Sequence, residues 1–253
     1  MKYKYAIELA YDGTNYHGWQ VQPNAITVQE VLEKAFSLIL GESLTVLGCG
    51  RTDAGVHAKY FVAHIMPSKP IEDCSKLVFK LNSYLPSAIV LFHIEAVPED
   101  FHARFSATSR AYEYHVHTRK SPFDHQYSYL LNYAPDFDLM NAAAQKLLDY
   151  SDFTSFSKSN SDVRTYICDV QEAYWEQLDD YHWVFNIKAN RFLRNMVRAI
   201  VGTLLEVGRG KKSIADFCHI IEAKDRTQAG VSAAGKALFL SDVTYPEAYH
   251  IKR

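Results

Sequence analysis

Residues 44–66 read LTVLGCGRTDAGVHAKYFVAHIM, and this stretch decides the fold because it contains two strand-like runs joined by a short loop. We expect sequential strands near 44–50 and 57–66. The loop between them contains Asp53, flanked by Gly50 and Gly55. Because these glycines permit backbone geometries closed to other residues, the loop can hold a carboxylate in a fixed, exposed pose.

The segments on either side of this stretch complete a β-α-β-β-α-β order. Before it, Tyr3 to Tyr11 alternates like a strand, and Thr27 to Glu30 forms a capping box for a helix that stops at Gly41. After it, we expect a helix over about 73–85, ending before a proline, and a strand over 89–97. This order is the ferredoxin-like arrangement.

The second half of the chain repeats the same order of elements. We expect strands over 106–118, 165–177, 181–189 and 237–245, and helices over 139–150, over 191–207 and from Ser213 onward. The sequence therefore predicts an α+β protein of two ferredoxin-like β-α-β-β-α-β halves, 1–104 and 105–253, with their sheets side by side and the helices packed on one face. The polar loops 119–137 and 151–164 are interpreted as segments that reach a partner.

The composition is typical of a globular protein and not of a membrane protein. The chain has 253 residues, 48% of them hydrophobic, and no apolar run long enough to span a bilayer. Its N-terminus enters a strand directly, without a secretory signal, which favours the cytoplasm. The four cysteines lie far apart, which indicates buried thiols and neither a disulfide framework nor a zinc site. The net charge of −2 means that nucleic-acid binding requires a local basic patch.

Asp53 is the first candidate for chemistry, because a carboxylate can act as a nucleophile, a general base or a metal ligand. The plainer interpretation is a solvated Asp in a glycine-flanked turn. A metal-dependent hydrolase that uses Asp53, His57 and His64 is a further alternative. The two histidines are too loosely spaced to argue for zinc, so we expect no metal.

The predicted helix 191–207 carries three arginines among apolar residues. Arg191, Arg194 and Arg198 fall at i, i+3 and i+7, which predicts one stripe along the helix. A buried charge needs a partner, so at least one arginine should face a carboxylate or a phosphate; the alternative is a solvated face. Pairing of one arginine with Asp53 would lower the pKa of that carboxyl group and keep it ionised.

Residues 102–120 form a basic and aromatic cluster. Its members are His102, Arg104, Phe105, Arg110, Tyr112, Tyr114, His115, His117, Arg119 and Lys120. Arginines contact phosphates and aromatic rings stack on unpaired bases, so the cluster fits RNA. The alternative is a strand with a tyrosine face in the core.

The basic run from Gly208 to Ser213 is similar to a phosphate-binding loop. Leu205 stands where that motif needs glycine, so we expect a turn between two helices instead.

Five ordered segments resemble the TruA-type tRNA pseudouridine synthases. Tyr11 to Gln20 (YDGTNYHGWQ) is similar to the opening of that family, and Gly50 to Ala58 (GRTDAGVHA) to its catalytic loop. Phe101 to Tyr114 (FHARFSATSRAYEY) resembles the segment with the substrate-contacting tyrosine. Phe192 to Arg198 (FLRNMVR) resembles the basic helix, and Ala223 to Thr227 (AKDRT) the late motif.

The resemblance implies the pseudouridine synthase fold, with its active site in the cleft between the halves. It implies that Asp53 is the essential aspartate and that Arg198 pairs with it. Tyr112 would contact the target uracil and handle the proton at C5, and Arg51 would displace or hold the target nucleotide. We expect Arg110, Arg191 and Arg194 to bind the substrate as well.

The family isomerises uridine to pseudouridine at positions 38, 39 and 40 in the anticodon stem-loop of tRNA, without cofactor or metal and as a homodimer. The resemblance therefore implies tRNA as partner and a cytoplasmic isomerase. The alternative is a non-catalytic RNA-binding protein made of tandem ferredoxin-like units. The carboxylate loop around Asp53 argues against that alternative, because binding alone does not require it.

Overall fold

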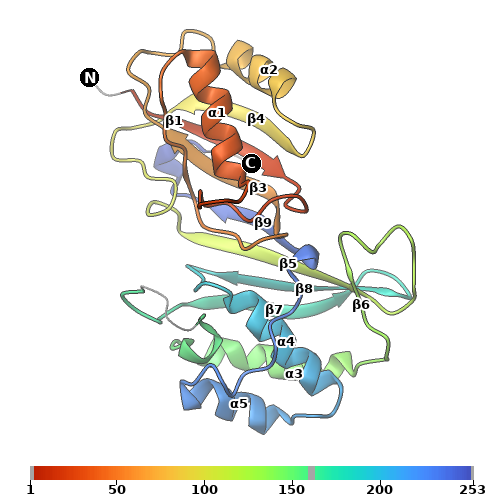
Figure 1. Ribbon diagram of the computed structural model, residues 1–253. Coiled ribbons are helices and arrows are strands. Elements are labelled where there is room, and N and C mark those ends of the chain that lie inside the picture. Colours follow the sequence, from red (N-terminus) through yellow and green to blue (C-terminus); the bar gives the residue numbers. More distant parts are fainter. Residues whose placement is uncertain (1–2, 159–162, 252–253) are drawn as a thin grey trace. The chain divides into compact units, whose positions relative to one another are not determined.

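The computed structural model describes residues 3–158 and 163–251 (Figure 1). Within these ranges it contains β-strands and five α-helices, so the predicted α+β class is confirmed. The chain divides into two compact units, unit 1 with Met1–Thr108 and Leu240–Arg253, and unit 2 with Ser109–Phe239. The domain division predicted at residue 104 stays a prediction. Along the described residues, no helix combines the length and apolar character needed to cross a membrane.

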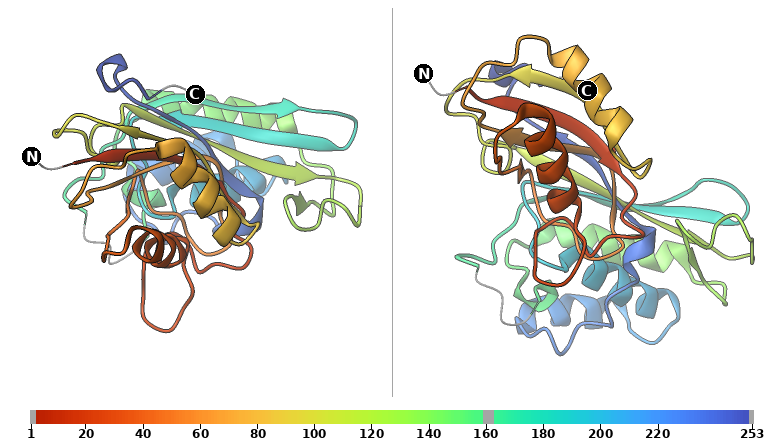
Figure 2. Two further views of the ribbon diagram at one scale, coloured as in Figure 1. Left: turned by 90° about the horizontal axis from the view of Figure 1, so that it is seen from above. Right: turned by 45° about the horizontal axis from the view of Figure 1, so that its top comes forward.

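Unit 1 has the predicted β-α-β-β-α-β order. Its elements are β1 (Tyr5–Tyr11), α1 (Val28–Leu40), β2 (Leu47–Gly48), β3 (His57–Ile65), α2 (Cys74–Tyr84) and β4 (Ile89–Ala96), with β9 (Leu238–Thr244) returning from the far end of the chain. The strands lie in the order β4-β1-β3-β9, and the short β2 pairs with β3. Helices α1 and α2 lie on the same face of these strands (Figures 1 and 2).

The ends of α1 lie where the sequence signals predict, but the capping box predicted at Thr27–Glu30 is only half formed. The Thr27 side chain accepts a hydrogen bond from the Glu30 amide at 3.3 Å, and the Glu30 carboxylate binds Lys34 one turn later. Gly41 ends the helix with φ 73°, where its amide donates to the Ser37 carbonyl. One face of α1 is buried, with Leu32 and Phe36 fully covered, and Ile7 and Leu9 of β1 and Phe61 of β3 are fully buried as well.

Unit 2 begins with the same order, β-α-β-β-α, but the last predicted strand, 237–245, corresponds to β9, which belongs to unit 1 from Leu240 onward. Its elements are β5 (Ser109–His117), β6 (Tyr129–Leu130), α3 (Phe137–Gln145), β7 (Val170–Gln177), β8 (His182–Ala189), α4 (Met196–Gly208) and α5 (Ile214–Ala223). The strands lie in the order β5-β8-β7, and β6 runs parallel to β5. Asp179 forms the predicted turn between β7 and β8, because its carboxylate accepts the amides of Tyr181 and His182.

Helix α4 begins five residues later than the sequence pattern predicts. Asn195 adopts a left-handed conformation with φ 67° immediately before Met196, which a continuous α-helix does not allow. Its side chain donates to the Ser232 hydroxyl at 2.7 Å and fixes this bend. Arg191 and Arg194 therefore lie in the preceding loop, and the predicted helical stripe of three arginines is wrong.

The predicted partner-reaching loop 151–164 is described only in part, because residues 159–162 lie outside the described residues. Its first part contains a short 3-10 turn, Thr154–Phe156. Phe153 and Phe156 are fully buried, so this part of the loop packs into unit 2.

Candidate active site

The loop between β2 and β3 holds Asp53 on an anchored backbone. Thr52, the preceding residue, is nearly buried, and its carbonyl accepts the Trp19 amide at 3.2 Å. The Thr52 hydroxyl lies 2.9 Å from the Tyr11 hydroxyl. The Asp53 carbonyl accepts the Val56 amide at 3.1 Å, which closes a turn, and the Asp53 side chain remains half-buried. The carboxylate is therefore held in a defined position while part of it stays accessible.

Glycines of the segment 11–20 press directly against this loop. A Cβ atom on Gly13 would lie 2.0 Å from the Val56 carbonyl oxygen, and one on Gly18 would lie 2.3 Å from the Thr52 carbonyl oxygen. Gly18 also has φ +87°, a conformation that side chains disfavour. Only glycine allows this close approach of two backbones at both positions.

The loop's own glycines differ from each other. Gly55 has φ +73° and donates its amide to the Tyr16 carbonyl at 3.2 Å, so the prediction for Gly55 is confirmed. Gly50 has no left-handed φ, and a Cβ atom there would meet open space. The prediction that Gly50 supplies a special geometry is therefore wrong.

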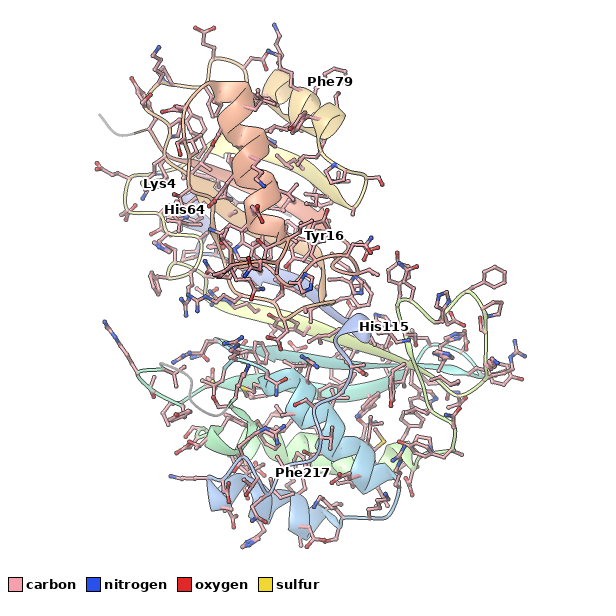
Figure 3. The ribbon with its side chains drawn as sticks, in the orientation of Figure 1. Lys4, Tyr16, His64, Phe79, His115 and Phe217 are labelled. Carbon is pink, nitrogen blue, oxygen red and sulfur yellow. The ribbon has the colours of Figure 1, made fainter. Side chains whose placement is uncertain are left out.

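The segment 11–20 packs against the loop of Asp53 and so belongs to the site. The periodicity of the sequence did not identify it. Trp19 is buried and stacks on Phe61 of β3 with ring centroids 4.1 Å apart. Tyr16, labelled in Figure 3, is also buried, and burial together with the charge of Asp12 raises the pKa of its hydroxyl. The available signal was the combination of two glycines and two aromatic residues within eight positions, which has no helical or strand period.

Arg51 extends from the same loop into solvent. Its Nε donates a hydrogen bond to the Gln20 side-chain oxygen at 3.1 Å, and both side chains are exposed. The sequence-predicted substrate contact thus lies two residues from Asp53 on an anchored backbone.

The two histidines of the metal alternative make hydrogen bonds with the protein. His57 is buried, accepts the Gly13 amide on Nδ1 at 3.1 Å, and lies 3.0 Å from an Asp12 carboxylate oxygen. His64 accepts the Ala103 amide at 3.2 Å, and burial lowers its pKa to about 4. In residues 3–158 and 163–251, no group of three or more His, Cys, Asp or Glu side chains is arranged to hold a metal ion.

Tyr112 lies on β5 of unit 2 and is half-buried. Its ring meets Phe192 edge-on, with centroids 5.1 Å apart and an interplanar angle of 88°. The neighbouring Arg110 donates from Nη1 to the Asn190 carbonyl at 2.9 Å. The loop before α4 therefore contacts the segment of β5 that carries both predicted substrate-binding residues.

Arg198 lies in the first turn of α4 and is half-buried. Its Nε donates to the Ala233 carbonyl at 2.7 Å, and the Ala233 amide donates back to the Arg198 carbonyl at 2.9 Å. The Arg198 charge also acts on Tyr114, where it opposes the rise in pKa that burial causes. These contacts hold Nε of the guanidinium group against the segment 229–233.

The segment 229–233 that holds Arg198 is itself fastened to α4. The Gly230 amide donates to the buried Thr203 hydroxyl at 3.0 Å, and a Cβ atom on Gly202 would lie 1.9 Å from the Val231 carbonyl oxygen. Arg226 donates to the carbonyls of residues 229 and 230 and to the Ser232 hydroxyl. The late motif thus shapes the segment that orients Arg198.

The other two predicted arginines are placed differently. Arg191 donates from Nη1 to the Thr165 carbonyl at 3.3 Å. Arg194 is exposed, and its backbone carbonyl accepts the Lys158 amide at 3.0 Å. Both belong to the loop before α4, together with Phe192, so unit 2 brings Tyr112, Arg110 and Arg191 to one region.

Comparison with known proteins gives one consistent result. The profile of the family described as tRNA pseudouridine synthase matches residues 8–106 and 143–246. A protein named tRNA pseudouridine synthase A from Bacteroides fragilis is 55% identical over 244 residues, which cover 96% of this chain and 97% of that protein. Proteins of the same name from Parabacteroides distasonis and Thermoanaerobacter pseudethanolicus are 53% and 42% identical, over 96% and 94% of this chain and 96% and 98% of their own lengths.

Proposed function

This chain belongs to the tRNA pseudouridine synthase family, and from that premise we propose that it isomerises uridine to pseudouridine at positions 38, 39 and 40 in the anticodon stem-loop of tRNA. The observation that carries the proposal is Asp53, a half-buried carboxylate on a loop that two glycines of the segment 11–20 hold in place. Such a preorganised carboxylate suits a reaction in which the base must be detached and reattached within one site.

The reaction breaks the bond from C1′ to N1 of uracil and forms a bond from C1′ to C5. The proton on C5 leaves, and N1 gains a proton. A base paired in a stem must first leave the helix, at a cost of roughly a few kcal/mol. Asp53 then acts as a nucleophile at the base or the sugar, or as a base at C2′ of the ribose, and each of these routes requires an ionised carboxylate.

We assign Arg198 as the counter-charge of Asp53. The Arg198 Nε donates to the Ala233 carbonyl, and a guanidinium group anchored in this way has a planar set of N–H donors that suits a carboxylate. A neighbouring guanidinium lowers the pKa of a carboxyl group and keeps it ionised at neutral pH. The backbone contacts around Ala233 support this role, because an arginine anchored at Nε loses little freedom when it pairs.

Tyr112 is assigned to the uracil ring and to the proton at C5. Its ring is half-buried and packs edge-on against Phe192, which gives an aromatic ring in a supported position for contact with a base. Arg51 is assigned to displacing or holding the target nucleotide, and Arg110, Arg191 and Arg194 are assigned to substrate binding. Because the net charge of the chain is −2, local basic residues must supply the affinity, which should fall steeply with salt.

The proposal includes a homodimer in the cytoplasm, and a reaction without cofactor or metal. The first test is pseudouridine mapping on a tRNA transcript incubated with the pure protein in excess chelator, with no cofactor added. Conversion at positions 38–40 is expected. Absence of conversion, with tRNA still bound, would support the non-catalytic RNA-binding alternative and overturn the proposal.

The second test replaces the carboxylate. Asp53→Asn keeps the size of the side chain, so the variant should fold and bind tRNA but form no pseudouridine. Normal turnover by this variant would remove Asp53 from the reaction. Sedimentation of the protein alone tests the dimer separately.

A further inference from the structure

Gln20 and Arg51 lie beside a backbone hydrogen bond that joins the segment 11–20 to the loop of Asp53. The Trp19 amide donates to the Thr52 carbonyl at 3.2 Å. Gln20 directly follows Trp19, and Arg51 directly precedes Thr52. Each of the two side chains is therefore attached one residue away from this hydrogen bond. The Arg51 Nε then donates to the Gln20 side-chain oxygen at 3.1 Å.

The backbone of Gln20 is fixed on both sides. Trp19 is buried against Phe61, and its carbonyl accepts the Gln29 amide at 3.1 Å. On the other side, the Val21 amide donates to the Gln29 side-chain oxygen at 3.0 Å. Gln29 is buried at the start of α1, where its side-chain nitrogen Nε2 donates to the Glu33 carboxylate at 2.9 Å. The exposed Gln20 side chain therefore projects from an anchored base.

The contact leaves the functional end of Arg51 open. In residues 3–158 and 163–251, the Arg51 side chain makes this single hydrogen bond, through Nε. Because Arg51 is exposed and bonds through Nε, Nη1 and Nη2 are left as a pair of donors, the set that matches a phosphate or the edge of a base. An exposed hydrogen bond between two side chains adds little to folding stability, since water replaces it readily. Its effect lies in the orientation of the guanidinium.

We propose that Gln20 is a positioning residue for the base-flipping step: it holds Nε of Arg51 so that both terminal nitrogens meet the displaced nucleotide. This inference rests on the proposed function, and in particular on the role of Arg51. Without the Gln20 acceptor, the Arg51 side chain regains rotamer freedom in the free protein and must lose it again when RNA binds. This entropy cost corresponds to a roughly two- to tenfold lower reaction rate.

The test uses three variants of the loop 20–22. Gln20→Met keeps the length of the side chain and removes the acceptor, so its kcat should fall roughly two- to tenfold. Gln20→Glu restores an acceptor and should keep kcat, while its added negative charge raises KM for RNA. Gln22→Met is the matched control, because Gln22 is an exposed neighbour whose side chain donates to the His17 carbonyl and does not touch Arg51. It should match the wild-type protein.

Two transcripts separate flipping from chemistry. One carries the target uridine in a Watson–Crick pair, and the other has the opposing base changed so that the uridine is unpaired. Tritium release from the C5 position reports each turnover. Gln20→Met should be slow on the paired transcript and near wild type on the unpaired one. In an Arg51→Ala background, adding Gln20→Met should cause no further loss.

Three results would overturn the inference: wild-type kcat for Gln20→Met on the paired transcript, equal losses on both transcripts, or a loss that adds fully to that of Arg51→Ala. Failure of the proposed function itself looks different. In that case the wild-type protein releases no tritium from either transcript.

Discussion

Replacing Gly18 by Ala should damage catalysis more than stability. The Cβ atom of alanine would lie 2.3 Å from the Thr52 carbonyl oxygen and 3.1 Å from the Asp53 carbonyl carbon. Ordinary van der Waals contact begins at 3.4 Å, so the new Cβ and the Thr52 oxygen must separate by about 1.1 Å. The backbone that carries Asp53 is the part that must move.

Two costs follow from this substitution, and they affect different measurements. The positive φ of Gly18 costs a non-glycine residue about 1–2 kcal/mol of stability, which corresponds to a fall in Tm of roughly 2–4 °C for each kcal/mol in a chain of this size. A displacement of about 1 Å in a reacting group lowers the rate by on the order of 100-fold. The expected phenotype is a folded protein with about 1% of the wild-type kcat.

Gly41→Ala is the matched control. Gly41 also has a left-handed φ, +73°, but a Cβ atom there meets nothing within 4 Å, and the residue caps α1. This variant should lose a similar amount of thermal stability and keep its kcat. Both are compared by thermal unfolding and by tritium release at saturating tRNA. If Gly18→Ala retained wild-type kcat at the same loss of Tm, the idea that this glycine sets the position of Asp53 would be refuted.

Three further predictions concern unit 2. Partial burial opposes the charge on His182, but hydrogen bonds to Asp179 and Asp124 outweigh it and raise its pKa. These contacts should therefore stabilise unit 2 fully below the unfolded pKa of about 6.5 and weaken as pH rises through the folded value, and His182→Gln should flatten this dependence in pH-dependent unfolding. Thr203→Val leaves a buried amide unpaired and should cost about 1–3 kcal/mol in urea unfolding; a stability equal to wild type would show that the amide finds another acceptor. Tyr112→Phe should fold, bind tRNA and lose most tritium release, and full activity would remove its hydroxyl from catalysis.

Local signals predicted most of the fold. The capping residue Thr27 and the terminal Gly41 bound α1 to the residue, and the Ser213–Asp216 pair forms the expected capping box of α5. The start of α4 was missed for a different reason. Leu193 and Met196 continue the apolar spacing of the helix backwards, but the left-handed Asn195 interrupts it. The Asn195 side chain donates to the hydroxyl of Ser232, far along the chain, and this hydrogen bond fixes the bend.

In the candidate site, too, features set by neighbouring residues could be predicted, and features set by contacts with remote residues could not. The loop of Asp53 was identified because glycines and a charged pair stand out within nine residues. The reason why Gly18 must be glycine was not visible, since the atom that excludes a side chain belongs to Thr52. Of the two loop glycines expected to have a special conformation, only Gly55 has a positive φ, and the other glycine that the loop requires is Gly18, against the Thr52 carbonyl.

Unit 1 is assembled from two distant parts of the chain. The Tyr245 hydroxyl donates to the Ala103 carbonyl at 2.5 Å, and the Thr108 amide donates to the Thr244 carbonyl at 2.8 Å. During translation, residues up to 108 emerge on the order of ten seconds before residues 240–251, at about 5–20 residues per second. Until then the part of the β3 edge that β2 does not cover lacks its neighbour β9 and stays open. The unit that begins first on the ribosome is therefore the last to be completed.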